Sequence, residues 1–243
     1  MRHSNRPPLK ENRYGTFEKS MAYYLAKSNR ITSRPQKQPS FVMSYSQARS
    51  IVWRIMVNRM QQQNRLPEVD IHNKAIIVNL IKYFIGDKTL RSDWSLHKGL
   101  LCIGDVGSGK TFLMSVMQDF CKVVRHPHHQ FKMKACTNIY DAINNNNPIK
   151  SLQPYYKNNW CFDDLGDEPT TLKYYGNDID FMTKIITRRY EIFVNGHCVT
   201  HATTNLIPKD IQEKYGARFF DPDASGCRAL FNIVVFKGES RRR

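Results

Sequence analysis

Apolar and polar positions alternate along most of this chain in a pattern typical of an α/β domain. Short apolar runs predict buried strands, and apolar residues at helical spacing predict helices between them. The predicted strands cover residues 100–103, 131–136, 159–162, 198–204 and 231–236. The predicted helices cover residues 44–64, 74–85, 112–120, 178–194 and 209–215, with a further helix after Thr137. At 243 residues there is enough chain for one α/β domain and an extension.

The first two predicted helices carry start and stop signals. Ser44 or Ser46 can cap the helix over 44–64, whose apolar stripe we interpret as a packing surface. Asn73 can cap the next helix, and Gly86 follows its last apolar position. We place the domain boundary between residues 66 and 72, with a basic, partly mobile extension over 1–70 and the α/β domain over 71–243.

The segment from Gly104 to Thr111 fits the phosphate-binding pattern G-x-x-x-x-G-K-[ST]. An apolar strand precedes it and a helix follows it, which is the context that this motif requires. Its glycines let backbone N–H groups point inward around an anion, at the positive end of the helix. The residues predicted to bind the nucleotide are Gly104, Asp105, Val106, Gly107, Ser108, Gly109, Lys110, Thr111 and Phe112.

This motif predicts binding of ATP and Mg²⁺. Lys110 is placed to reach the β- and γ-phosphates, and the Thr111 hydroxyl is placed to hold Mg²⁺. A glycine-rich turn followed by a chance Lys-Thr pair is the minor alternative. The motif alone does not separate an ATPase from a GTPase, a kinase or a helicase. No N-K-x-D stretch follows a strand, however, which disfavours a GTPase.

Polar side chains end two other predicted strands. Asp163 and Asp164 follow one strand, where Asp163 can orient Mg²⁺ and Asp164 can polarise the attacking water. Asp167 and Glu168 lie close by, so the assignment of the base stays open between these acids. Asn205 ends the next strand, where an amide can contact the γ-phosphate or its water, or can simply start a turn.

The charge distribution points to a polyanionic partner. The formal net charge is +16, and residues 1–65 alone hold 13 Lys or Arg against two Glu, giving +11. Nucleic acid is the simplest such partner. Aromatic residues among these cations, such as Tyr14 and Phe17, suit single-stranded bases or a protein surface equally well. A mobile basic tail that only adds solubility is the alternative.

Cysteines, histidines and hydropathy add little chemistry. The six cysteines never form C-x-x-C, so we expect reduced core thiols in a cytoplasmic protein. The cluster His126-Pro127-His128-His129 fits a surface loop better than a metal site. No apolar run approaches the ~20 residues of a membrane span, and no export signal is expected.

The order of these motifs resembles the AAA+ ATPases of the DnaC/IstB type, which include bacterial replicative-helicase loaders and transposition helper ATPases. The resemblance rests on Asp163-Asp164-Leu165-Gly166 and on Thr203-Thr204-Asn205-Leu206, and it covers residues 72–243. It implies a P-loop NTPase (AAA+) fold, a three-layer α/β sandwich with a five-stranded parallel sheet and no helical lid domain. It also implies that Lys110 and Thr111 belong to Walker A, that Asp163 and Asp164 form Walker B, and that Asn205 is sensor 1.

The arginines of this family are harder to assign. The resemblance implies an arginine finger that reaches a neighbour's phosphates, and Arg228 and Arg218 are the two candidates. The family's Ser-Arg pair is not in register here. Arg241 or Arg242 is a candidate second sensor.

We therefore expect a helper of DNA replication that binds and hydrolyses ATP, resembling a helicase loader. Its expected partners are single-stranded DNA and a hexameric replicative helicase, with assembly into a homo-oligomer on ATP or DNA. Two alternatives stay open, namely an IstB-like transposition helper that binds a transposase and a non-hydrolysing module gated by ATP.

Overall fold

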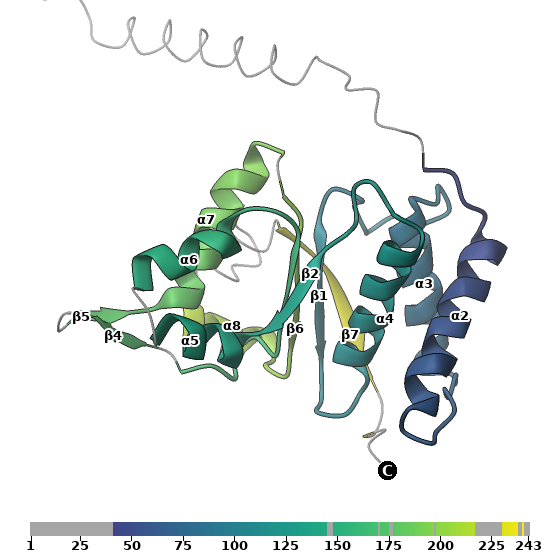
Figure 1. The fold of residues 1–243 in the computed structure, drawn as a ribbon, viewed down its shortest axis with the longest axis horizontal. Coiled ribbons are helices and arrows are strands. Elements are labelled where there is room, and N and C mark those ends of the chain that lie inside the picture. The colour runs from purple at the N-terminus through teal and green to yellow at the C-terminus, as the bar shows by residue number, and fades with distance from the viewer. Residues whose placement is uncertain are drawn as a thin grey trace, which may run out of the picture. The chain divides into compact units, whose positions relative to one another are not determined.

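The chain folds around a five-stranded parallel sheet with the strand order β2-β3-β6-β1-β7 (Figure 1). This computed structural model describes residues 41–144, 148–169, 171–174, 177–196, 198–216, 230–237 and 240. The strands are β1 (Gly99–Gly104), β2 (Lys132–Ala135), β3 (Trp160–Asp163), β6 (Thr200–Thr204) and β7 (Phe231–Phe236). All five lie where the apolar runs predict strands.

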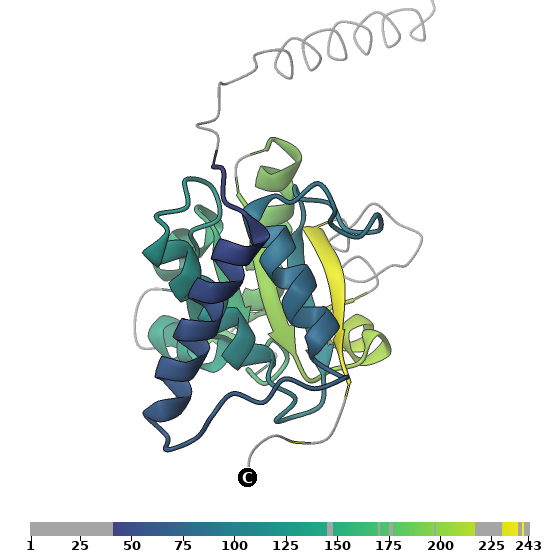
Figure 2. The same cartoon turned by 90° about the vertical axis from the view of Figure 1, so that its right-hand side faces the viewer.

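Both faces of the strands β1 and β3 are buried, which explains why these two strands are apolar without alternation. In β1, Leu100 and Cys102 belong to one hydrophobic cluster, and Leu101 and Ile103 belong to the other. The helices α2 (Tyr45–Gln61), α3 (Lys74–Ile85) and α4 (Lys110–Val123) cover the first face (Figure 2). The opposite face is covered by α5 (Cys136–Asn144), α6 (Pro148–Tyr156), α7 (Phe181–Val194) and α8 (Pro208–Tyr215).

The predicted helix ends are largely confirmed. Ser44 caps α2 in a capping box, because its hydroxyl accepts from the Gln47 N–H and the Gln47 side chain accepts from the Ser44 N–H. Gly86 ends α3 in the left-handed conformation, at φ 66°. Asn73 does precede α3, but its side chain bonds to the preceding turn, at Asp70 N–H and Glu68 O, and not to the helix.

The helix α2 belongs to the same compact unit as the five-stranded sheet, although the sequence pattern placed it in the extension. Ala48, Val52 and Met56 are buried against α3 and α4, and the compact unit of the described chain begins at Phe41. The apolar stripe of this helix is therefore a packing surface, as predicted, and it packs against the helices α3 and α4 that cover the sheet. Residues 1–40 of the expected extension lie outside the described residues.

Three details differ from the sequence pattern. The helix α6 was not predicted, and neither was the antiparallel hairpin of β4 (Leu172–Tyr174) and β5 (Asn177–Ile179). The helix expected from Asp178 starts at Phe181, because the Asp180 carboxylate caps it by accepting from the Thr183 N–H at 2.9 Å. No described helix is both long enough and apolar enough to cross a membrane.

A buried arginine joins the elements at the amino-terminal edge of the sheet. Arg189 of α7 is fully buried and donates to three backbone oxygens, Tyr155 O, Asn158 O and Val199 O, at 2.8–2.9 Å. It also donates to the Thr200 hydroxyl at 2.9 Å. Burial lowers its pKa to about 10, so the side chain is charged at neutral pH. It thus ties α6, α7 and the starts of β3 and β6 together.

Beside this edge, β1 and β6 come unusually close at Gly99. A Cβ on Gly99 would lie 1.6 Å from the Thr200 carbonyl oxygen, so only glycine fits. The next N–H, that of Leu100, donates to the Nδ1 atom of buried His201 at 3.1 Å. A side-chain acceptor therefore replaces a backbone acceptor where the two strands begin to pair.

His201 is part of an aromatic cluster that also contains His126 and His129. Their rings pack with Tyr83, Phe84 and Phe131. The surface position expected for residues 126–129 applies to Pro127 and His128, whereas His126 is only 4% exposed. Among the described residues, no group of His, Cys, Asp and Glu is arranged to hold a metal ion.

Candidate nucleotide-binding site

The polar residues predicted for the site come together at the carboxyl ends of three adjacent strands. The order β3-β6-β1 places the ends of these strands side by side. The P-loop follows β1, Asp163 ends β3, and Asn205 follows β6. This edge of an open α/β sheet is where such folds bind their ligands.

The P-loop depends on two glycines with positive φ. Gly107 has φ 86°, and Gly109 has φ 98° directly before the first residue of α4. A Cβ on Gly107 would also lie 2.2 Å from the Ser240 hydroxyl oxygen. The loop therefore has the backbone of an anion nest at a helix amino terminus, and Ser240 of the carboxy-terminal segment lies against it.

Lys110 links the P-loop to the end of β6. Its Nζ atom donates to Gly104 O at 2.7 Å, to Asp105 O at 2.9 Å and to Asn205 Oδ1 at 2.8 Å. The residue is only 4% exposed. Burial lowers the pKa of the Lys110 ammonium, and the nearby Asp164 carboxylate opposes this shift. A cation is thus held between the loop and the predicted sensor amide.

Asp163 is held by hydroxyl groups from two neighbouring elements. Its Oδ1 atom accepts from Thr111 Oγ1 at 2.9 Å and from Thr203 Oγ1 at 2.6 Å. The carboxylate is buried, whereas Thr111 is exposed at the start of α4. The structure therefore joins the two predicted metal-binding residues directly.

Asp164 occupies a turn that β6 holds in place. It is a non-glycine residue with φ 50°, and its N–H donates to Thr203 Oγ1 at 2.9 Å. The next N–H, of Leu165, donates to Thr203 O at 2.8 Å. The unusual backbone of Asp164 is thus fixed by one threonine, and its side chain is half-buried at the strand end.

The contacts and exposure of Glu168 and Asp167 indicate which acid after β3 is placed to act as a base. Glu168 is 3% exposed, and its carboxylate accepts from the Gly166 N–H at 2.9 Å and from the Tyr215 hydroxyl. Lys214 Nζ lies 3.8 Å from the same carboxylate. Glu168 therefore holds the turn after β3 against α8, while Asp167 is exposed. Asp164 is the acid that best fits the position of a base.

The remaining predicted residues divide into two groups. Asp105 and Val106 are exposed in the P-loop, Ser108 is buried there, and Phe112 packs partly against the α2–α4 side of the sheet. Four candidate arginines lie outside the described residues, namely Arg218, Arg228, Arg241 and Arg242. The arginine finger and the second sensor therefore remain predictions.

Sequence reasoning gave no role to Thr203. This residue contacts both predicted Walker B acids, and Thr204 similarly donates its hydroxyl to Leu165 O at 2.6 Å. A signal was present, because two adjacent hydroxyl residues end an otherwise buried strand just before Asn205. Their partners could not be identified without the strand order, which places β6 beside β3.

The residues present fit a nucleoside triphosphate and Mg²⁺. The nest of backbone N–H groups and the Lys110 ammonium suit phosphate oxygens. The Thr111 hydroxyl and the Asp163 carboxylate supply oxygen ligands, which Mg²⁺ prefers. These two side chains would hold the ion next to the P-loop.

Comparisons with known proteins give the fold but no family assignment. Neither a protein-family model nor a curated protein sequence matches this chain. Among solved structures, DnaI is 16% identical with a TM-score of 0.51, and the match covers 79% of this chain and 92% of DnaI. The DnaC helicase loader is 17% identical over 76% of this chain and 98% of its own, with a TM-score of 0.47. AMPPCP-bound DnaA from Aquifex aeolicus is 13% identical over 71% of this chain and 49% of its own, with a TM-score of 0.44.

The DnaI comparison confirms the fold that the motif resemblance implies. This chain has a P-loop NTPase fold with a five-stranded parallel sheet between two layers of helices.

Proposed function

We propose that this chain is an Mg²⁺-dependent ATPase that assists DNA replication in the manner of a helicase loader. One observation carries the ATPase part. The adjacent residues Lys110 and Thr111 form direct hydrogen bonds to the ends of two other strands, Lys110 to Asn205 Oδ1 at 2.8 Å and Thr111 to Asp163 Oδ1 at 2.9 Å. A glycine-rich turn with a chance Lys-Thr pair would not place an acid and an amide from two other strands at these positions.

Each side chain has a distinct task in this proposal. Lys110 binds the β- and γ-phosphates in place of its present backbone acceptors, and Asn205 keeps the ammonium oriented toward them. Asp164 polarises the attacking water, and Thr203 fixes the backbone from which that carboxylate projects. Thr111 and Asp163 would hold Mg²⁺, which would supply positive charge beside the phosphates.

The replication role rests on the motif resemblance, on the DnaI-like fold and on charge. The order of Walker A, D-D-L-G and T-T-N-L is that of the DnaC/IstB-type ATPases, and the net charge of +16 favours a nucleic-acid partner. In this proposal, single-stranded DNA binds the basic residues of the chain, and the segment over residues 1–70 binds a hexameric helicase. An arginine of a neighbouring copy, Arg218 or Arg228, completes the ATP site in a homo-oligomer.

The first test measures ATP binding and turnover of the purified protein, with and without single-stranded DNA. Lys110→Ala is expected to abolish nucleotide binding, because it removes the only cation held in the described part of the site. Asp164→Ala is expected to bind ATP normally and to lower turnover by about 100-fold, within the range for loss of a general base.

Asp167→Ala is the matched control, because it removes an exposed acid three residues from Asp164 and should leave turnover unchanged. Normal turnover in Lys110→Ala or Asp164→Ala would refute the site. Tight ATP binding without turnover in the unaltered protein would favour the non-hydrolysing module.

The partner is tested separately by pull-down with a purified hexameric helicase and with a purified transposase. Retention of the helicase in the presence of ATP is expected. Retention of the transposase alone would replace the loader proposal with the transposition-helper alternative.

A further inference from the structure

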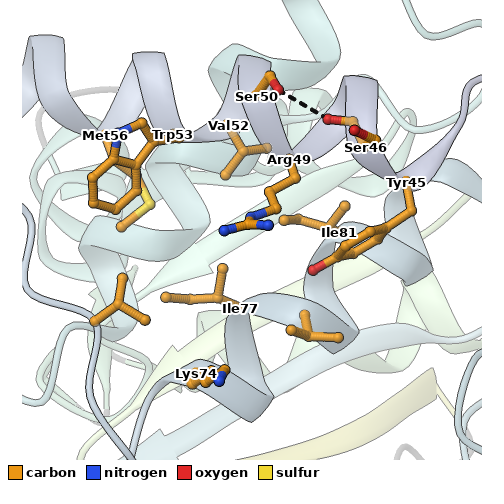
Figure 3. A pocket seen from close by; sticks show the side chains of 12 residues that line it. Tyr45, Ser46, Arg49, Ser50, Val52, Trp53, Met56, Lys74, Ile77 and Ile81 are labelled. Carbon is orange, nitrogen blue, oxygen red and sulfur yellow. Dashed lines mark hydrogen bonds between the residues drawn. The ribbon is translucent and has the colours of Figure 1, made fainter.

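A groove of about 620 Å³ runs between α2 and α3, in the helical layer and outside the ATP site (Figure 3). Four side chains that are at most 8% exposed line it: Val52, Met56, Ile77 and Ile81. Trp53 flanks these residues and is 46% exposed, although it is a large apolar side chain. The groove therefore has an apolar floor and a solvent-exposed aromatic residue at its side.

The two charged residues that line this groove are both positive. Arg49 projects between the two helices, and Lys74 lies at the start of α3 on the opposite side (Figure 3). No acidic residue occurs in α2 or α3, and neither Arg49 nor Lys74 forms an ion pair within the described structure. In the adjoining loop, the Asp70 carboxylate is occupied by the N–H groups of His72 and Asn73.

We propose that this groove docks a helical segment of a partner protein that carries acidic residues beside apolar anchors. The lining residues of α2, from Tyr45 to Met56, extend for about 16 Å along the helix, which is about three turns of a docked helix. An apolar floor accepts side chains at i, i+3 and i+4, and the two cations pair with the acids beside them. Trp and Arg are also the residue types that contribute most to binding at interfaces.

The same observations disfavour two other occupants. The floor is aliphatic and thioether, and the two aromatic residues of the lining, Tyr45 and Trp53, lie at opposite ends of the groove (Figure 3). They do not form the continuous row of aromatic faces on which successive bases of a single strand stack. The chain's own residues 1–40 carry nine Lys or Arg against two Glu, so their charge repels Arg49 and Lys74. A helix with acidic flanks is the occupant that matches both the floor and the rim.

The test uses the full chain and two synthetic amphipathic peptides of about 14 residues. One peptide has Leu anchors and Glu on its polar face, and the other has Lys in place of every Glu. Trp53 gives a direct readout, because it is 46% exposed while Trp94 and Trp160 are 8% exposed, so docking shifts the fluorescence of Trp53. The acidic peptide is expected to bind and to shift this emission, and the basic peptide is not.

Variants separate the groove from a general attraction to a basic protein. Arg49→Glu and Trp53→Ala are expected to weaken binding of the acidic peptide by about tenfold or more, as loss of a central interface residue does. The matched control is Arg54→Glu, which makes the same charge change on the exposed part of α2 outside the groove and should alter binding less than about twofold. Thermal unfolding verifies that each variant is folded.

Several results would overturn the proposal. These are equal binding of the basic peptide, equal loss in Arg54→Glu, no saturable binding of the acidic peptide up to about 1 mM, or displacement of the peptide by an oligo-dT strand. None of these binding measurements uses ATP. The docking proposal can therefore be refuted while the ATPase proposal stands, and the ATPase proposal can be refuted while the docking proposal stands.

Discussion

At the scale of single residues, one threonine organises the acidic part of the candidate site. Thr203 donates its hydroxyl hydrogen to Asp163 and accepts from the Asp164 N–H. It therefore aligns both acids of the pair, although it lies on a different strand. Side chains that orient metal-binding groups in this way affect activity without touching the substrate.

Thr203→Val should accordingly lower ATP turnover by about tenfold to 100-fold, because valine keeps the shape but removes both hydrogen bonds. Steady-state ATPase assays measure this loss. Thr203→Ser retains the hydroxyl and should restore most of the activity. An equally low rate in both variants would mean that the methyl group, not the hydroxyl, is what matters.

A second residue-scale prediction concerns Arg189. Replacement by methionine fills similar space but removes the Arg189 donor from the carbonyls of Tyr155 and Asn158 and from the buried Thr200 hydroxyl, while Val199 O keeps the Trp160 N–H. The free energy of unfolding should fall by about 3 kcal/mol or more, since each buried unsatisfied group costs about 1–3 kcal/mol. Urea unfolding measures this change.

Arg188→Met is the matched control for this experiment. Arg188 is the neighbouring residue of the same helix, is exposed and pairs only with Glu191 one turn away. Its loss should cost no more than about 0.5 kcal/mol. Similar losses in the two variants would contradict the role given to the buried arginine.

At the scale of elements, apolar periodicity predicted the five sheet strands and the main helices, because each element buries a continuous apolar surface. It did not predict α6, whose segment contains Pro148 and Pro154, residues that disfavour helices. The three-residue strands β4 and β5 are too short to give a periodic signal. Motifs predicted that the loop after β1 and the acids Asp163 and Asp164 lie at one edge of the sheet, whereas the contacts of Thr203 and Glu168 depend on how the elements pack.

The placement of α2 leads to a prediction about truncation. Deletion of residues 1–40 should leave the stability of the domain near that of the full chain, because the described core begins at Phe41. Deletion of residues 1–66 removes α2 and uncovers α3 and α4. The loss of buried Val52 and Met56 alone predicts a decrease of about 4 kcal/mol in the free energy of unfolding.

Thermal and urea unfolding of the two truncated proteins measure this difference. Equal stability of both proteins would support the domain boundary between residues 66 and 72 that the sequence pattern predicts.

At the scale of the whole molecule, buried histidines make stability depend on pH. Burial lowers the pKa of His126 and His201 to about 3 and that of His129 to about 4, against about 6.5 in an unfolded chain. Below pH 6.5 the unfolded chain binds protons at these positions and the folded chain does not. The free energy of unfolding is therefore not reduced by these histidines above pH 6.5. It decreases progressively as the pH falls from 6.5 toward 4.

Urea unfolding between pH 7.5 and pH 5 should show this decrease, in a range where most carboxylates do not yet titrate. His201→Gln keeps an acceptor for the Leu100 N–H and should reduce the slope. His128→Gln alters an exposed histidine and should leave the slope unchanged. A slope that does not respond to His201→Gln would assign the pH dependence to other groups.

The contact at Gly99 has a consequence for finding distant relatives of this chain. A Cβ there would lie 1.6 Å from the Thr200 carbonyl oxygen, so no other residue is compatible with this approach of β1 to β6. Any sequence that keeps this close approach of the two strands must keep glycine at this position, however low its overall identity to this chain. Glycine at the first position of the strand that leads into the P-loop, combined with histidine in β6, is therefore a pattern to look for in sequences of the same fold.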